Sequence, residues 1–563
     1  MKFLKTFFSS LKSYIVVKIV LLFSIAVMAF SGPNYFEISK NLEIFSNLYR
    51  ELSLHYVEEI NPGEIMKTGI DAMLESLDPY TTFIPEADIE DYRFMTTGQY
   101  GGIGSLIRNN GEEIIIAEPY EGFPADKAGL KPGDVIVEVD GIEISGKSTS
   151  EVSDILKGQA GTTLVLKYKR FGDIHEVEML REEIKIPNVP YAAMLDDEVG
   201  YISLSGFTET ASKEVKEAFL DLKKQNMKKL VFDLRGNGGG LLRESVDIVN
   251  FFVEKGQEVV STRGRTEDSE RIHRAKNNPL DLDIPVVVLV DGGSASASEI
   301  VSGALQDLDR GVVVGKTTFG KGLVQQTRDL EYNSKLKLTV AKYYTPSGRC
   351  IQKIDYSKKG DDGRSDAVAD SLLGMFYTTG GRKVTDGRGI EPDVKIPDRI
   401  FSKISKSLVG KNLVFDYAND YMYKHDSIAP ARVFDISDDI YDNFVEFLAD
   451  KDYDYTTRTE RALEELKEVA EEEQYFKYGE EEYEQLMNKL IKDKKGDLRK
   501  FREEISEFLK LEIVSRYYYR TGKIAASLDT DEYVQQALEI LHSDEQYRAI
   551  LSGPEKSGND TDN

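Results

Sequence analysis

The chain has 563 residues, of which 40% are hydrophobic and 30% charged, which is enough for several domains with apolar cores. Its formal net charge of −26 disfavours nucleic acid and other polyanions as partners. The single cysteine, Cys350, excludes an intrachain disulfide and a thiolate metal cluster, and the five histidines show no ligand spacing. We therefore expect no metal and no cofactor.

Residues 1–31 have the order of an export signal. Three early lysines precede the apolar run Ile19–Phe30, in which Ala29 is a small residue suited to a cleavage site. The alternative is a retained anchor through 14–30, although the apolar run is shorter than the roughly 20 residues of a spanning helix. We expect export to the periplasm, with this segment either cleaved or holding the protein at the inner membrane.

Helical periodicity marks the next segment, 35–97. Apolar residues recur at threes and fours from Leu42 to Leu52 and from Ile65 to Leu77, which predicts short helices. Pro79 ends the second pattern.

A β-rich module follows at 98–182. The run Ala128–Asp134 lies between predicted strands, with a helix expected near 150–156, and this pattern resembles a PDZ domain. The resemblance implies that the N–H groups of a loop bind the terminal carboxylate of a peptide, which adds as a strand. A plain tight turn is the alternative, whereas no G-x-G-x-x-G leads into a helix as a dinucleotide loop requires. The matching loop positions are Gly102, Ile103 and Gly104.

Strands and helices alternate from 183 to 398. Leu230–Leu234 and Pro285–Val290 are continuous apolar runs, which predict buried parallel strands that each lead into a loop and a helix. The loops Arg235–Gly240 and Gly292–Glu299 therefore meet at the carboxyl edge of one sheet, where ligands usually bind.

The sequence around these loops contains residues that could form a serine hydrolase site in which a lysine replaces the usual histidine. Ser296 stands at a predicted helix N-terminus, and no histidine lies between Gly292 and Gln325. Lys321 is flanked by two glycines, and a lysine whose pKa is lowered by burial can take the serine's proton. Taken alone, the serine would be an ordinary turn residue and the lysine a solvated surface group.

Further groups complete the expected site. Gln325 is a candidate to hold the lysine's amine, or else satisfies a strand. The N–H groups of Ala297 and of Gly238 or Gly239 are the natural donors to an oxyanion. Asp307 follows the serine by 11 helical residues, roughly 16 Å, so we expect a structural role for it.

Several motifs together resemble the C-terminal processing, or tail-specific, serine proteases. The similarity spans about 35–397 and implies a crotonase/ClpP-like α/β core, residues 183–398, preceded by the PDZ domain. It also selects Ser296 rather than Ser294 or Ser298 as the partner of Lys321. The motifs are Gly293–Glu299, Phe319–Gly322 with Gln325, Asp233–Gly239, Tyr344–Arg349, Leu77–Thr81 and Gly389–Asp393.

Residues 400–551 lie beyond this resemblance. Their acidic, helix-periodic sequence predicts a helical accessory domain, which is a candidate surface for a homo-oligomer or an adaptor. Residues 552–563 are polar and predict a disordered tail.

The favoured function is that of an exported serine endopeptidase that recognises protein C-termini through its PDZ domain. It would cleave near them through an acyl-enzyme. Three alternatives remain: a non-catalytic PDZ scaffold or chaperone, a trypsin-like protease, for which Gly236–Gly240 lacks the serine, and a crotonase-fold CoA enzyme.

Overall fold

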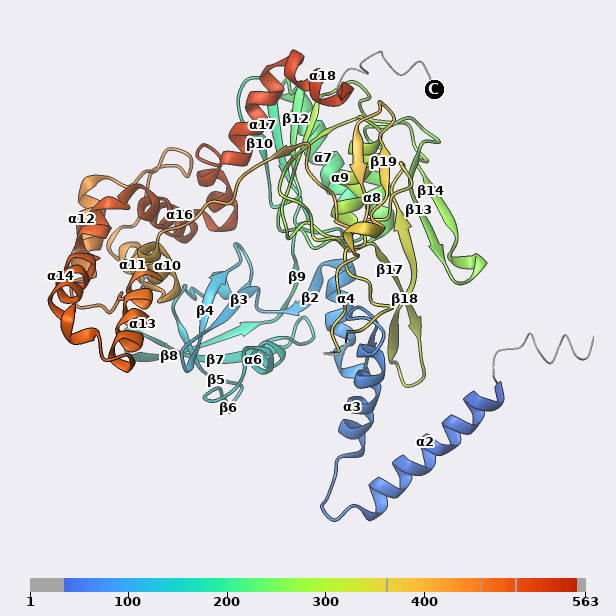
Figure 1. The fold of residues 1–563 in the computed structure, drawn as a ribbon. Coiled ribbons are helices and arrows are strands. Elements are labelled where there is room, and N and C mark those ends of the chain that lie inside the picture. Colours follow the sequence, from blue (N-terminus) through green and yellow to red (C-terminus); the bar gives the residue numbers. More distant parts are fainter. Residues whose placement is uncertain (1–34, 361–362, 457, 492–493, 554–563) are drawn as a thin grey trace, which may run out of the picture. The chain divides into compact units, whose positions relative to one another are not determined.

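The computed structural model of the chain describes residues 35–360, 363–456, 458–491 and 494–553 (Figure 1). Two compact units are present, Met1–Phe83 and Ile84–Asn563. The expected export signal lies outside the described residues, as does the expected tail from residue 554 onwards. Within the described ranges, no helix combines the length and the apolar character needed to cross a bilayer.

The described part of the first unit contains two helices, which match the two periodic segments in the sequence. The second begins where local chemistry favours a start, because Asn61 accepts hydrogen bonds from the N–H groups of Gly63 and Glu64, and Pro62 is the first helical residue. The first helix has no buried residue. The helices are α2 (Tyr35–His55) and α3 (Pro62–Glu75).

The second unit opens with a helix, α4, and then the β-rich PDZ module. Its antiparallel sheet has the strand order β3-β4-β5-β7-β8, so β3 lies at an edge. Helix α6 begins with a reciprocal cap between Ser148 and Glu151, and it buries Val152 and Leu156 against the sheet. The bounds are α4 (Ile89–Thr97), β3 (Ser105–Asn110), β4 (Glu113–Pro119), α5 (Pro124–Lys127), β5 (Val135–Val139), α6 (Thr149–Leu156), β7 (Thr163–Arg170) and β8 (Asp173–Leu180).

The predicted parallel strands form the central sheet of the α/β core. Leu230 pairs with Val286 and Phe232 with Val288, and the apolar runs are buried on both faces. This double burial explains why the runs are continuously apolar. In sheet order, the strands are β10 (Tyr191–Met194), β11 (Val199–Ser203), β12 (Lys229–Asp233), β15 (Val286–Val290), β16 (Val312–Gly315) and β21 (Val394–Lys395).

Different parts of the chain cover the two faces of this sheet (Figure 1). Three helices that follow core strands cover one face: α7 (Ala211–Lys224), α8 (Leu242–Val249) and α9 (Ala297–Asp307). The other face is covered by α17 (Glu532–His542) and α18 (Asp544–Ser552).

The last two helices of the region 400–551, which the sequence predicts as a helical accessory domain, pack on the core sheet. Tyr547 Oη accepts the Val286 N–H at 3.0 Å, and Lys229 Nζ donates to the Leu541 carbonyl at 2.6 Å. The physical reason is that a parallel sheet needs an apolar cover on both faces, and the helices after core strands supply only one.

A second, antiparallel sheet stands beside the core. Its hairpin of β17 and β18 pairs Gln325 with Thr339 and Thr327 with Lys337. Because side chains alternate along a strand, these four residues share one face of the hairpin. Four of its strands are β17 (Leu323–Asp329), β18 (Lys335–Tyr344), β13 (Glu258–Gly264) and β14 (Arg271–Arg274).

Most of the remaining helices pack around an apolar core of their own, and they contact the PDZ sheet. The Phe415 ring lies under two guanidinium groups, Arg108 at 4.0 Å and Arg516 at 4.5 Å. The observed architecture agrees with the expected one in its α/β core, its β-rich module and its helical C-terminal region. The helices are α10 (Lys403–Gly410), α11 (Leu413–Lys424), α12 (Asp438–Phe447), α13 (Arg458–Glu472), α14 (Glu480–Ile491), α15 (Lys494–Lys500) and α16 (Arg502–Ser527).

Candidate active site

The turn between β15 and α9 contains three serines with different surroundings. Ser294 and Ser298 are fully buried, and their hydroxyls donate to the carbonyls of Leu234 and Asn237, each at 2.8 Å. Ser296 instead lines a cavity. Two of the serines therefore bind this turn to the glycine loop after β12, and the third is accessible for chemistry.

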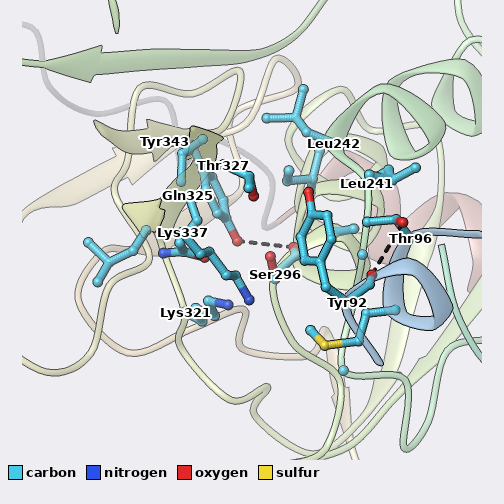
Figure 2. A pocket seen from close by; sticks show the side chains of 18 residues that line it. Tyr92, Thr96, Leu241, Leu242, Ser296, Lys321, Gln325, Thr327, Lys337 and Tyr343 are labelled. Atoms are coloured by element: carbon cyan, nitrogen blue, oxygen red, sulfur yellow. Dashed lines mark hydrogen bonds between the residues drawn. The ribbon is translucent and has the colours of Figure 1, made fainter. Parts of the chain in front are cut away.

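The backbone of Ser296 is held in an unusual conformation. Its φ of 55° and ψ of −109° are unfavourable for a residue with a side chain. The Ser296 N–H donates to Glu299 Oε2 at 2.8 Å, and Tyr343 Oη donates to the Ser296 carbonyl at 3.1 Å (Figure 2). These contacts retain the strained turn that places the serine at the start of α9.

The glycine loop after β12 lies directly against this turn. A Cβ atom on Gly239 would stand 2.8 Å from Ser296 Cβ, so only glycine fits. The Gly239 N–H donates to Asn237 Oδ1 at 2.9 Å. The Gly238 and Ala297 N–H groups donate to no acceptor among the described residues, which leaves them as candidate oxyanion donors.

The loop that carries Lys321 is fixed to the same turn. The Phe319 N–H donates to the Ser294 carbonyl at 3.0 Å, and Gly320 has a φ of 88°. The N–H groups of Gly320 and Lys321 donate to the two oxygens of Glu299, at 2.8 and 2.9 Å. The loops of the candidate nucleophile and base are thus joined through one carboxyl group.

Glu299 is the centre of this arrangement. Its side chain is fully buried and also accepts a hydrogen bond from Thr318 Oγ at 2.6 Å. Burial raises its pKa from the ordinary 4.5 to about 7, against four hydrogen bonds that favour the ionised form. In the sequence, Glu299 is recognisable only as the last residue of the motif Gly293–Glu299. Its position three residues into a helix after Ser296 is the signal that indicates a contact with the helix start.

One cavity of about 420 Å3 brings the predicted site residues together (Figure 2). Gln325 lies in its wall and donates from Nε2 to Thr339 Oγ at 3.1 Å. The predicted residues in the lining are Ser296, Lys321, Gln325, Ala297, Gly238 and Gly239, and the sequence reasoning missed Tyr92, Lys337 and Tyr343.

Asp307 lies at the far end of α9. It is fully buried, forms an ion pair with Arg349 at 2.8 Å, and accepts the Ser347 N–H at 3.0 Å. This agrees with the structural role expected from its distance along the helix.

The predicted peptide-binding loop of the PDZ domain connects β2 (Gln99–Gly102) to β3. The Ile103 and Gly104 carbonyls accept the N–H groups of Ala125 and Tyr120, both at 2.8 Å. The Ile103 and Gly104 N–H groups donate to no acceptor in the described part of the chain. Gly102 pairs with Glu182. Two backbone donors beside an edge strand are therefore available to a peptide carboxylate.

Three family models match the chain. Peptidase family S41 matches 198–358, a PDZ domain matches 115–170, and the probable PDZ-protease C-terminal helical domain matches 404–541.

The chain is also similar to individual proteases. A carboxy-terminal-processing protease of Bartonella bacilliformis is 38% identical over 321 residues, which cover 56% of this chain and 73% of the relative. A probable CtpA-like serine protease of Staphylococcus aureus is 36% identical over 313 residues, 55% of this chain and 62% of the relative. Among solved structures, the photosystem II D1 C-terminal processing protease is 29% identical, with a TM-score of 0.34 over 62% of this chain and 92% of its own.

Proposed function

Because the chain belongs to the S41 family of carboxy-terminal-processing proteases, and is therefore a serine-type peptidase, we propose that it cleaves proteins near their C-termini through Ser296 and Lys321. The observation that carries this proposal is that the hydroxyls of Ser294 and Ser298 are buried in hydrogen bonds to the backbone. Ser296, in contrast, lines the cavity together with Lys321. The family assignment also favours a peptidase over the two alternatives of a non-catalytic scaffold and a CoA enzyme.

In the proposed reaction, neutral Lys321 Nζ takes the proton from Ser296 Oγ as the oxygen attacks the peptide carbonyl. The Gly238 and Ala297 N–H groups stabilise the negative oxygen. When the C–N bond breaks, the ammonium returns a proton to the departing amine and leaves an acyl-enzyme. Lys321 then removes a proton from a water molecule, which hydrolyses the ester and restores Ser296.

The PDZ domain supplies the selection of substrate in this proposal. The Ile103 and Gly104 N–H groups bind the terminal carboxylate of a protein, and its last residues add as a strand beside β3. The position of β3 at the edge of its sheet and the two available donors support this assignment. Capture of a tail raises the local concentration of nearby peptide bonds at Ser296.

Export remains part of the proposal on the strength of residues 1–31 alone. We infer that this segment directs the protein to the periplasm, where it is cleaved or serves as an anchor. Cell fractionation of the full chain and of a chain without these residues tests the inference, which fails if both are found in the same compartment.

The dyad is tested with Ser296→Ala and Lys321→Ala against a protein bearing an accessible C-terminal tail. Each variant should fold and lose at least about four orders of magnitude in kcat, measured by mass spectrometry of released peptides. Lys342→Ala is the matched control, since Lys342 is an exposed lysine on β18 outside the cavity lining. Turnover near wild type in either dyad variant would exclude the proposed pair.

A further inference from the structure

The cavity lined by Ser296 has basic side chains, although the molecule as a whole is acidic. The chain carries a net charge of −26, yet the described lining has two lysines, Lys321 and Lys337, and no carboxylate. The proposed base must be neutral to accept a proton, so Lys337 supplies the cavity's fixed positive charge.

Lys337 is placed toward the cavity by the geometry of the hairpin. It pairs with Thr327 across β17 and β18, on the same face as the Gln325–Thr339 pair. Thr327, Gln325 and Lys337 all line the cavity, and Figure 2 shows their side chains around the same space as Ser296. An ammonium group at this position faces any peptide that occupies the site.

No carboxylate in the described part of the chain balances the charge of Lys337. Two residues earlier on the strand, Lys335 forms an ion pair with Asp329 at 2.5 Å. Among the described residues, no carboxylate forms an ion pair with Lys337, and burial alone lowers its pKa. A half-buried ammonium without an anionic partner is unfavourable in the empty site, and an incoming carboxylate relieves that cost.

We propose that Lys337 is a specificity residue whose ammonium group binds a carboxylate of the substrate peptide during cleavage at Ser296. The carboxylate is either an acidic side chain near the cleaved bond or the free C-terminal carboxylate of the peptide. This inference rests on the proposed function, because it assigns selectivity to the same cavity.

The first test uses peptides that differ only by Glu or Gln at successive positions around the cleaved bond. Wild type should favour Glu at one position by about ten- to a hundredfold in kcat/KM, the size of a charge-assisted contact. Lys337→Met should abolish this preference, mainly through a higher KM, because the contact forms before the chemical step. Lys337→Glu should reverse this preference, so that Gln is favoured over Glu.

A second series separates the two sources of the carboxylate by comparing free and amidated C-termini. If Lys337 binds the terminal carboxylate, amidation should weaken cleavage by wild type and have no effect on Lys337→Met. If amidation weakens both equally, the PDZ loop is responsible, and the proposal then stands only on the Glu/Gln preference. Lys342→Met controls for the loss of one lysine from the same strand.

The outcomes distinguish this inference from the proposed function. If wild type cleaves none of the peptides, the proposed function fails and the inference fails with it. If wild type cleaves them with equal efficiency for Glu and Gln and for free and amidated ends, only the inference is overturned. A Lys337→Met variant that shifts the pH profile of kcat without changing either preference would also overturn it, because Lys337 would then act on Lys321. Should this variant not fold, the preferences of wild type still decide the result.

Discussion

At the scale of single residues, Glu299 explains how two loops that are distant in sequence keep a fixed geometry. Its carboxyl group accepts from the backbone of Ser296 and of Lys321, at 2.8 and 2.9 Å. Four groups donate hydrogen bonds to this carboxyl group, so both of its terminal atoms must be hydrogen-bond acceptors. A shift of either loop by about 1 Å would cost roughly a hundredfold in rate, because the reacting atoms lose their alignment.

The Glu299→Gln variant should therefore fold but lose about a hundredfold in kcat with little change in KM. The amide nitrogen of glutamine would face an N–H group instead of accepting from it. Steady-state kinetics on a tail peptide measures the effect, and Glu391→Gln, which removes an exposed carboxylate, is the control. Equal kcat in both variants would show that Glu299 does not position the dyad.

A comparison of wild type with Glu299→Gln also reports on pH-dependent stability. The pKa of Glu299 is about 7 in the folded chain against 4.5 ordinarily, so the folded state binds this proton more tightly. The stabilisation that comes from protonated Glu299 is fully present below about pH 4.5 and is lost as the pH rises through about 7. Thermal melting between pH 5 and 8 should show wild type losing stability relative to Glu299→Gln as the pH increases. Parallel curves would contradict the raised pKa.

At the scale of elements, the contact between the glycine loop and the nucleophile turn depends on the absence of one side chain. Gly239 has a φ of 99°, and a Cβ there would also stand 2.7 Å from the Ala295 carbonyl. Gly239→Ala should therefore push the two loops apart and lower kcat by roughly tenfold or more. Gly292→Ala is the matched control, since its Cβ would meet nothing within 4 Å. Kinetics on one peptide compares the two, and equal activity would mean that the loops tolerate separation.

The sequence predicts these elements better than it predicts their contacts. Continuous apolar runs identify β12 and β15, and the small residues around Ser296 identify the turn between strand and helix. The role of Glu299 is less visible, because a carboxylate in the first turn of a helix is favourable even when it is exposed. Lys337 is hidden for a similar reason, since alternation on a hairpin shows which residues share a face but not what that face meets.

At the scale of the whole second unit, the C-terminal helices belong to two structures. Helices α10, α11, α12, α15 and α16 share an apolar core, whereas α17 and α18 cover the protease sheet. Periodicity predicts that α17 buries one face, but it cannot identify the strand, some 250 residues earlier, that the face meets. Arg235, at the start of the glycine loop, adds a polar contact with this cover through an ion pair to Asp531 at 2.8 Å.

If α17 completes the core, a cavity beneath it should destabilise the peptidase itself. Leu541 is 1% exposed in the layer between α17 and the sheet, so Leu541→Ala should cost about 2–5 kcal/mol. Leu466→Ala makes the same change on α13, where the side chain is 59% exposed, and should cost less than about 0.5 kcal/mol. Peptidase activity that remains after heating measures the stability of the core directly. Equal heat resistance in both variants would mean that α17 is dispensable. A selective loss in Leu541→Ala would show that the sheet depends on the end of the chain, because only that substitution opens a void against β12 and β15.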